Sequence, residues 1–264
     1  TGNEGIIVTS EAYHGNSELT SGFSPSMGEN SRLGTWVRRV PAPDTYRVDT
    51  KNMGEWLAER VTEQIRDLER RGVGLAAFVA DSLFSSDGIF AHDPGLLEPV
   101  LKVVHAAGGI FVADEVQCGF ARTGSHMWGY QRHGVVPDII SLGKPMGNGY
   151  PVAGIAIRPE VASDFGHDMR YFNTFGGNTV AMAAANATLD VVQGENLLEN
   201  SRKVGEIMLS GLRELMQGDE RIGDVRGTGL YMGIEMVKNR KTRESDSALA
   251  LALVNEMRRR RVLI

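Results

Sequence analysis

Two residues that could do chemistry each stand at the end of an apolar run. Lys144 follows the run 138–142, and Asp114 ends the run 109–114. If each run is a buried strand, both side chains lie at the carboxyl edge of a sheet, where ligands bind in open α/β folds. An amine there can form a Schiff base with an aldehyde cofactor, and a carboxylate there can hold a pyridine nitrogen protonated. Together they point to pyridoxal 5'-phosphate.

Each residue also has a simpler interpretation. Lys144 could be a solvated lysine after a strand, and Asp114 could be an acidic strand end or could bind a ribose or a metal. The sequence does not match a Walker-type phosphate loop, because Pro145 stands where that motif needs Ser or Thr and Asp138 stands where it needs its first glycine. The six histidines are scattered without ligand spacing, so we expect no metal site. A Gly-x-Ser-x-Gly elbow for hydrolysis is also missing.

Two other segments could contribute to the same site. Tyr13-His14-Gly15 follows the first predicted strand, and Tyr13 could fill the core or stack on a flat cofactor. Thr174 precedes two glycines and Asn178 at a predicted helix start, where a hydroxyl and free amides can hold a phosphate. The simpler interpretation of that second segment is that Asn178 caps the helix.

The apolar pattern alternates between strands and helices. It predicts strands at 5–9, 74–80, 109–114, 138–142 and 152–157, and helices at 52–71, 94–107, 177–193 and 196–217. Continuous apolar strands between helices indicate an α/β fold, with a mostly parallel sheet covered by helices on both faces. Pro94 and Gly108 would bracket the second helix. The polar segment 14–50 reads as a long functional loop.

The pattern of apolar and charged residues changes after about residue 200. The sequence predicts a strand at 230–237 and then a helix carrying Leu249, Leu253 and Met257. We therefore expect a large domain over 1–200 and the beginning of a smaller α+β domain over 201–264. Both ends of the chain interrupt predicted elements, so we expect an excerpt of a longer polypeptide.

Composition excludes several classes of partner. Hydrophobic residues make up 42% and charged residues 23% of the 264 residues, and the net charge is −5, which favours neither nucleic acid nor a membrane surface. The basic cluster 258–261 reads as the last turn of a helix. No apolar run approaches the ~18 residues of a membrane span. Cys118 is the single cysteine, which excludes an internal disulfide and fits a reducing, cytoplasmic location.

Four motifs, taken in order, resemble the class III aminotransferases of the ornithine, GABA and ω-amino acid type, which have the fold type I of pyridoxal phosphate enzymes. The motifs are Tyr13-His14-Gly15-Asn16, the stretch 113–124 around Asp114-Glu115-Val116-Gln117, the stretch 137–144 ending in Gly143-Lys144, and Asn173-Thr174-Phe175-Gly176-Gly177-Asn178. The resemblance runs from about residue 5 to the end of the chain.

The resemblance implies a role for each central residue. Lys144 is the Schiff-base lysine and later the general base of the proton shift, and Asp114 pairs with the pyridine nitrogen. The implied activity moves an amino group from an amine or an (ω-)amino acid to a 2-oxo acid such as pyruvate.

The resemblance also fills in the cofactor site. Tyr13 and Val116 sandwich the ring, Gln117 contacts its hydroxyl, and His14 and Gly15 belong to the same binding set. Thr174 binds the phosphate of the neighbouring subunit's cofactor, which implies a homodimer with shared active sites.

The chain departs from the family pattern after the predicted strand 74–80. Members that use glutamate commonly carry two glutamates there, whereas this chain has Asp81 in the first place and Ser86 in the second. The segment 143–149, with 171–174, is similar to a branch that contains phospho-lyases acting on phosphoethanolamine-like amines. Elimination of phosphate from such an amine is therefore the alternative function.

Overall fold

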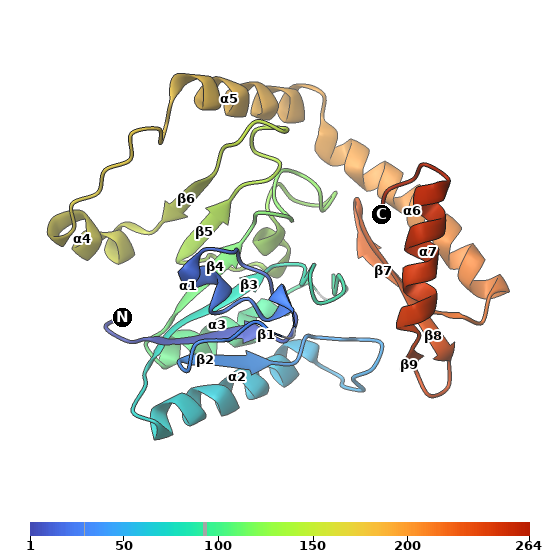
Figure 1. Ribbon diagram of the computed structural model, residues 1–264, viewed down its shortest axis with the longest axis horizontal. Coiled ribbons are helices and arrows are strands. Elements are labelled where there is room, and N and C mark those ends of the chain that lie inside the picture. The colour runs from blue at the N-terminus through green and yellow to red at the C-terminus, as the bar shows by residue number, and fades with distance from the viewer. Residues whose placement is uncertain (29, 92–93) are drawn as a thin grey trace.

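A six-stranded sheet forms the centre of the computed structural model, which describes residues 1–28, 30–91 and 94–264 (Figure 1). Its strand order is β2-β1-β3-β4-β5-β6. The bounds are Gly5–Thr9 for β1, Val37–Val40 for β2, Leu75–Asp81 for β3, Ile110–Asp114 for β4, Ile139–Leu142 for β5 and Gly154–Ile157 for β6. The first five strands run parallel, and β6 is antiparallel to β5. The predicted fold class is confirmed, and all five predicted strands of this sheet are present.

Two amphipathic helices cover one face of this sheet. Helix α2 (Met53–Arg70) begins at Asn52, whose side chain accepts the Glu55 N–H at 3.2 Å, and it buries an apolar stripe. Helix α3 (Leu97–Ala106) packs beside it, and the two share a core with alternate residues of the strands, such as Phe78 and Phe111. The other face is covered over β1–β3 by the segment 12–36, through Phe23 and Trp36.

The end of α3 leads directly into the central strand β4. Gly108 has a φ of +75°, which a side chain would disfavour, and this turn delivers the chain into β4. The prediction for Pro94 was wrong, because α3 begins at Leu97 and the proline lies ahead of the helix.

One strand and two α-helices around the large sheet were not predicted. The segment 14–50 is not irregular throughout, because it contains β2 and the single-turn helix α1 (Glu18–Ser21). Helix α4 (Pro159–Asp168) follows β6 and begins with a proline in its first turn. A strand of four residues is too short to give a clear alternation, and α4 has mostly exposed side chains.

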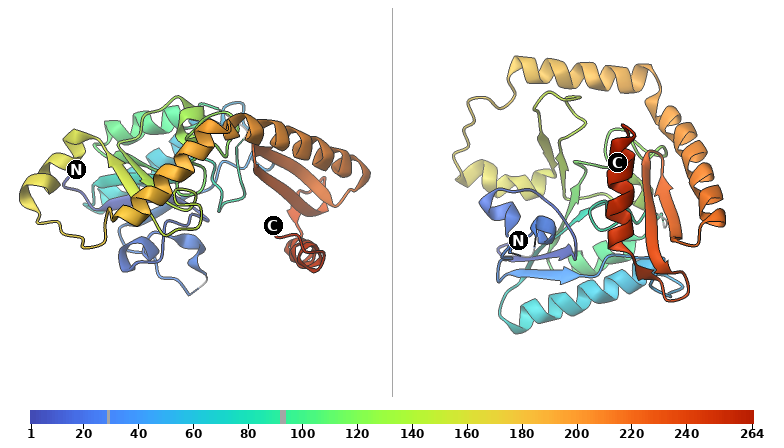
Figure 2. Two further views of the ribbon diagram at one scale, coloured as in Figure 1. Left: turned by 90° about the horizontal axis from the view of Figure 1, so that it is seen from above. Right: turned by 45° about the vertical axis from the view of Figure 1, so that its right-hand side comes forward.

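A second, three-stranded antiparallel sheet follows the long helices. Helix α5 (Thr179–Gly194) leads into α6 (Leu197–Gly218), which packs on the sheet β7-β8-β9 together with α7 (Ser247–Arg259) (Figure 2). The bounds are Ile222–Thr228 for β7, Tyr231–Asn239 for β8 and Glu244–Ser245 for β9. Strand β8 matches the predicted strand at 230–237, whereas β7 was not predicted. The division into domains at residue 200 stays a prediction. Within the described ranges, no helix is both long and apolar enough to cross a membrane.

Candidate functional site

Three polar residues lie side by side at the carboxyl edge of the large sheet. Asp81 at the end of β3 is in register with Asp114 at the end of β4, and Asp114 is in register with Ser141 of β5. Parallel pairing of these strands brings their ends to one edge, as the sequence predicted.

Asp114 is held by three hydrogen-bonding groups. Its Oδ1 accepts the Ser141 hydroxyl and the Val116 N–H, both at 3.1 Å, and its Oδ2 lies 2.8 Å from His14 Nδ1. Burial alone raises the pKa of Asp114, but the hydrogen bond and charge of His14, with the other donors, outweigh it and lower the pKa. The side chain remains 13% exposed, so an ionised carboxylate is fixed in place and still accessible.

His14 comes from the loop between β1 and α1. Its backbone N–H donates to Ser24 Oγ at 2.9 Å, and its ring lies 5.9 Å from the ring of Phe23. The side chain is almost fully buried behind Asp114. Its Nε2 is buried and has no partner among the described residues. The predicted residues His14 and Asp114, far apart in sequence, are therefore in direct contact.

Lys144 lies in the first turn after β5, the neighbour of β4. A Cβ on Gly143 would come 3.2 Å from Val116 Cγ1, so the bare glycine lets this turn approach Val116 closely. The turn is closed by Met146 N–H, which donates to the Gly143 carbonyl at 2.7 Å. Lys144 is exposed, and within the described part of the chain its amine makes no hydrogen bond or ion pair. The segment thus presents an exposed amine in the turn whose Gly143 packs against Val116.

Tyr13 and Gln117 flank the same edge. Tyr13 is 40% exposed, so its ring is not the core filler of the simpler interpretation. Gln117 follows β4, and its carbonyl accepts the hydroxyl of Tyr231 at 2.5 Å, which ties the segment to β8. The side chain of Gln117 is half-buried. The roles predicted for these two residues stay predictions.

Within one chain, Thr174 lies away from the residues at the edge of the large sheet. It lies in the exposed segment between α4 and α5, which in Figure 1 arches along the outside of the molecule, away from β3 and β4. Asn178 does cap α5, because its side chain accepts the Ala181 N–H at 2.9 Å. The capping interpretation of Asn178 is thus confirmed, and the phosphate role of Thr174 stays a prediction.

The two departures from the glutamate pattern lie at the end of β3 and in the loop that follows it. Asp81 Oδ1 accepts the Leu83 N–H at 2.7 Å, so the carboxylate serves its own loop. Burial raises the pKa of Asp81 to about 6. Ser86 is exposed. This loop therefore offers no second carboxylate at the place of Ser86.

Sequence reasoning missed the structural importance of Glu115. Its side chain is fully buried and accepts the Ser82 hydroxyl at 2.7 Å, the Gly129 N–H at 2.7 Å and the Tyr130 N–H at 2.8 Å. The two amides belong to the start of the 3₁₀ helix η2 (Gly129–His133). A glutamate directly after a strand-end aspartate looks like a surface residue in sequence, and no local signal distinguishes it.

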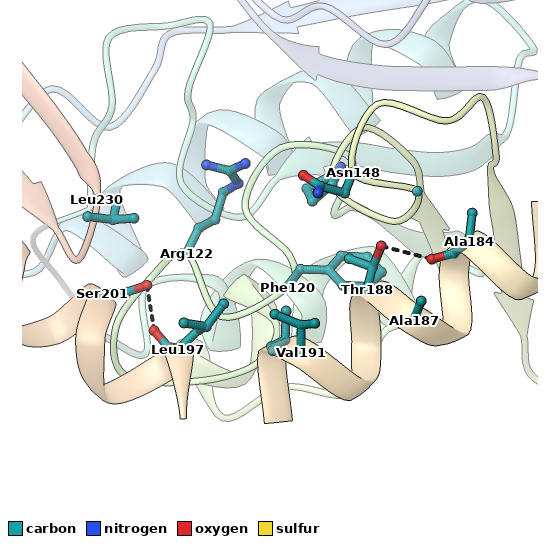
Figure 3. Close-up of a pocket in the computed structure, with 13 residues that line it drawn as sticks. Phe120, Arg122, Asn148, Ala184, Ala187, Thr188, Val191, Leu197, Ser201 and Leu230 are labelled. Atoms are coloured by element: carbon teal, nitrogen blue, oxygen red, sulfur yellow. Dashed lines mark hydrogen bonds between the residues drawn. The ribbon is translucent and has the colours of Figure 1, made fainter. Parts of the chain in front are cut away.

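A cavity of about 500 Å³ lies next to this edge but does not contain its central residues. Figure 3 shows its lining, which includes Phe120, Arg122 and Asn148 on one side and Thr188 and Leu197 from α5 and α6 on the other. Neither Lys144 nor Asp114 lines it. The candidate cofactor site therefore lies at the side chains of the sheet edge and not in this cavity.

These side chains fit pyridoxal phosphate. An ionised, partly accessible carboxylate suits a protonated pyridine nitrogen, and the buried imidazole of His14 holds that carboxylate from behind. Lys144 supplies an amine without a competing partner in the described ranges, and the exposed ring of Tyr13 offers a stacking face.

Known proteins with similar sequences belong to one family. The family model for aminotransferase class III matches residues 1–262. Ethanolamine-phosphate phospho-lyase homolog 1 of Caenorhabditis elegans is 39% identical over 277 residues, which cover 98% of this chain and 59% of that protein. The alanine–glyoxylate aminotransferase 2-like protein of Drosophila melanogaster is 38% identical over 276 residues, which cover 100% and 56%. The chain thus spans less than two thirds of these relatives.

Solved structures give the same result. A phospholyase from Arthrobacter in complex with phosphoethanolamine has a TM-score of 0.93 and 36% identity, and the match covers 100% of this chain and 63% of that one. An aminotransferase from Bacillus anthracis has a TM-score of 0.87 and 28% identity, covering 98% and 60%. Enzymes of this family depend on pyridoxal phosphate, in agreement with the fit at the sheet edge. The chain belongs to the class III aminotransferase family.

Proposed function

We propose that the protein is a pyridoxal phosphate-dependent aminotransferase that moves an amino group from an amine or an (ω-)amino acid to a 2-oxo acid such as pyruvate. The observation that carries this proposal is the anchored carboxylate of Asp114 on β4, beside the turn that presents Lys144 after β5. When bound, the cofactor supplies the electron sink that stabilises negative charge on the substrate carbon.

Asp114 keeps the pyridine nitrogen protonated, because a carboxylate with a lowered pKa is a strong partner for a cation. His14 and Ser141 orient this carboxylate from two sides. Their bonds fix its position before the cofactor arrives, which reduces the reorganisation that binding requires.

Lys144 would hold the cofactor through its amine and would move the proton at the substrate carbon. It follows Gly143, which packs closely against Val116, and Val116 covers one face of the ring. Tyr13 covers the opposite face, and Gln117 bonds the ring hydroxyl.

We further propose that the active enzyme is a homodimer in which Thr174 binds the phosphate of the partner's cofactor. The segment around Thr174 exposes large aromatic side chains: Tyr171 is 73%, Phe172 is 87% and Phe175 is 80% exposed. Apolar surface of this extent is typical of an interaction site. Sedimentation of the full-length protein tests the dimer.

The second candidate function is elimination of phosphate from a phosphoethanolamine-like amine. Two relatives favour it, since one is named a phospho-lyase homolog and the Arthrobacter structure holds phosphoethanolamine. The same residues would hold the cofactor, and the substrate would lose phosphate and ammonia and take up one water molecule to give an aldehyde.

One experiment separates the two functions. Full-length protein is mixed with an amine donor alone, and then with phosphoethanolamine alone. A transaminase converts its bound cofactor to the aminated form and stops until a 2-oxo acid is added. A lyase releases phosphate and aldehyde continuously without any oxo acid. The first result supports amino transfer, and the second replaces it with elimination.

The cytoplasmic location stays a prediction that cell fractionation tests.

A further inference from the structure

The loop that carries Tyr13 and His14 is fixed at both of its ends. At the far end, His14 is held by Ser24 and Asp114. At the near end, the Glu11 N–H donates to Asp87 Oδ1 at 2.8 Å, and the Thr9 hydroxyl donates to Asp87 Oδ2 at 2.6 Å. Asp87 therefore accepts hydrogen bonds from Thr9, the last residue of β1, and from Glu11, which lies two positions ahead of Tyr13.

Asp87 itself stands on a rigid loop. The N–H groups of Asp87, Gly88 and Ile89 all donate to the Phe84 carbonyl, at 3.0 to 3.2 Å. Phe84 is buried. Gly88 has a φ of +133°, a conformation that a side chain would strain.

A second contact anchors this loop from the small sheet. Arg226 of β7 donates from Nε to the Gly88 carbonyl at 2.8 Å, and its guanidinium lies 4.8 Å from the ring of Phe90. Arg226 is 4% exposed, so this contact is shielded from water. The carboxylate of Asp87 is thus mounted on a platform tied to both sheets.

We propose that Asp87 is a positioning residue that locks the β1–α1 loop against the loop after β3 and so sets how tightly Tyr13 and His14 hold the cofactor ring. Asp87 does not touch the cofactor. It acts through the hydroxyl of Thr9 and the backbone N–H of Glu11, since β1 and β3 are neighbouring strands whose following loops meet at this edge. The inference rests on the proposed cofactor site.

The test uses full-length protein with two changes that remove the same contact. Asp87→Ala deletes both accepted hydrogen bonds, and Thr9→Val deletes one donor while keeping the shape of a buried side chain. Thr9→Ser restores the hydroxyl. The matched control is Asp44→Asn, because Asp44 also accepts backbone N–H groups, from Tyr46 and Arg47, in a loop without cofactor residues.

Three readouts follow the proposal. In the apoprotein, amide hydrogen exchange at Glu11 should become at least about tenfold faster in Asp87→Ala, because the amide loses its acceptor. The dissociation constant of pyridoxal phosphate should rise about tenfold, as expected when a hydrogen bond to a charged group no longer orders the loop. The visible circular dichroism band of the bound cofactor should change in Asp87→Ala and Thr9→Val and return in Thr9→Ser.

The inference would be overturned if both variants fold and keep the amide exchange rate, the affinity for pyridoxal phosphate and the dichroism band of the wild type, even if their melting temperatures fall. The Asp44→Asn control should lower only stability. Failure of the proposed cofactor site itself would give a different result: borohydride reduction of the wild-type holoenzyme would then attach the pyridoxyl group to a lysine other than Lys144.

Discussion

Glu115 offers the sharpest test of how the site edge is built. The change Glu115→Gln keeps the volume of this fully buried side chain but replaces one carboxylate oxygen with an NH₂ group. Both oxygens accept hydrogen bonds, from Ser82 and Tyr130 on Oε1 and from Gly129 on Oε2. Whichever way the amide turns, at least one buried backbone N–H then faces another donor.

The expected cost follows from that count. A hydrogen bond to a charged acceptor contributes about 1.5–3 kcal/mol, and a buried donor without a partner costs about 1–3 kcal/mol. We expect Glu115→Gln to lower the free energy of unfolding by about 3 kcal/mol, and Glu115→Ala to lower it further because the side chain also leaves a cavity.

Urea unfolding of the full-length apoprotein, followed by circular dichroism, measures this change. The control is Glu199→Gln on the surface of α6, where an exposed pair with Arg202 should leave the unfolding curve unchanged. A loss below about 1 kcal/mol for Glu115→Gln would refute the reasoning, because it would mean that the three bonds do not hold the start of η2 against Ser82.

Three further changes test other parts of the structure. Burial raises the pKa of Asp81 from 3.8 to about 6, so the folded state takes up a proton in this window and stability should fall as pH rises from about 4 to 6. Asp81→Asn should remove that fall and be more stable than wild type at pH 7; equal stability there would contradict the burial argument. Arg226→Met should lower the free energy of unfolding in urea by about 3–5 kcal/mol, because it removes the buried partner of the Glu235 carboxylate, and an unchanged midpoint would show that the link between the sheets contributes nothing. Thr174→Ala should weaken cofactor retention about tenfold while leaving apoprotein stability unchanged, and unchanged retention in equilibrium dialysis would remove its phosphate role.

The sequence predicted the strands that position the site because their signals are local. The apolar runs before Asp114 and Lys144 are bounded by Gly, Pro or Asp, and β4 and β5 appear where these runs stand. Because ligands bind at the carboxyl edge of such sheets, the sequence then predicted that Asp114 and Lys144 share that edge. The contact between His14 and Asp114 was not predicted: the resemblance put both residues in the cofactor-binding set, but nothing local links positions 100 residues apart.

The elements that were missed depend on long-range contacts. Strand β2 exists because it pairs with β1, and its four residues carry no pattern of their own. Glu115 and Asp87 look like ordinary acidic residues until the fold brings backbone amides to them from other segments. Strand β7 is recognisable mainly by its pairing with β8.

Borohydride reduction of the purified full-length protein, followed by peptide mass analysis, tests directly whether Lys144 binds the cofactor. We expect a single pyridoxyl group on the Nζ atom of Lys144 and none in Lys144→Ala. A label on another lysine, or no label on protein that retains the cofactor's absorbance, would contradict it.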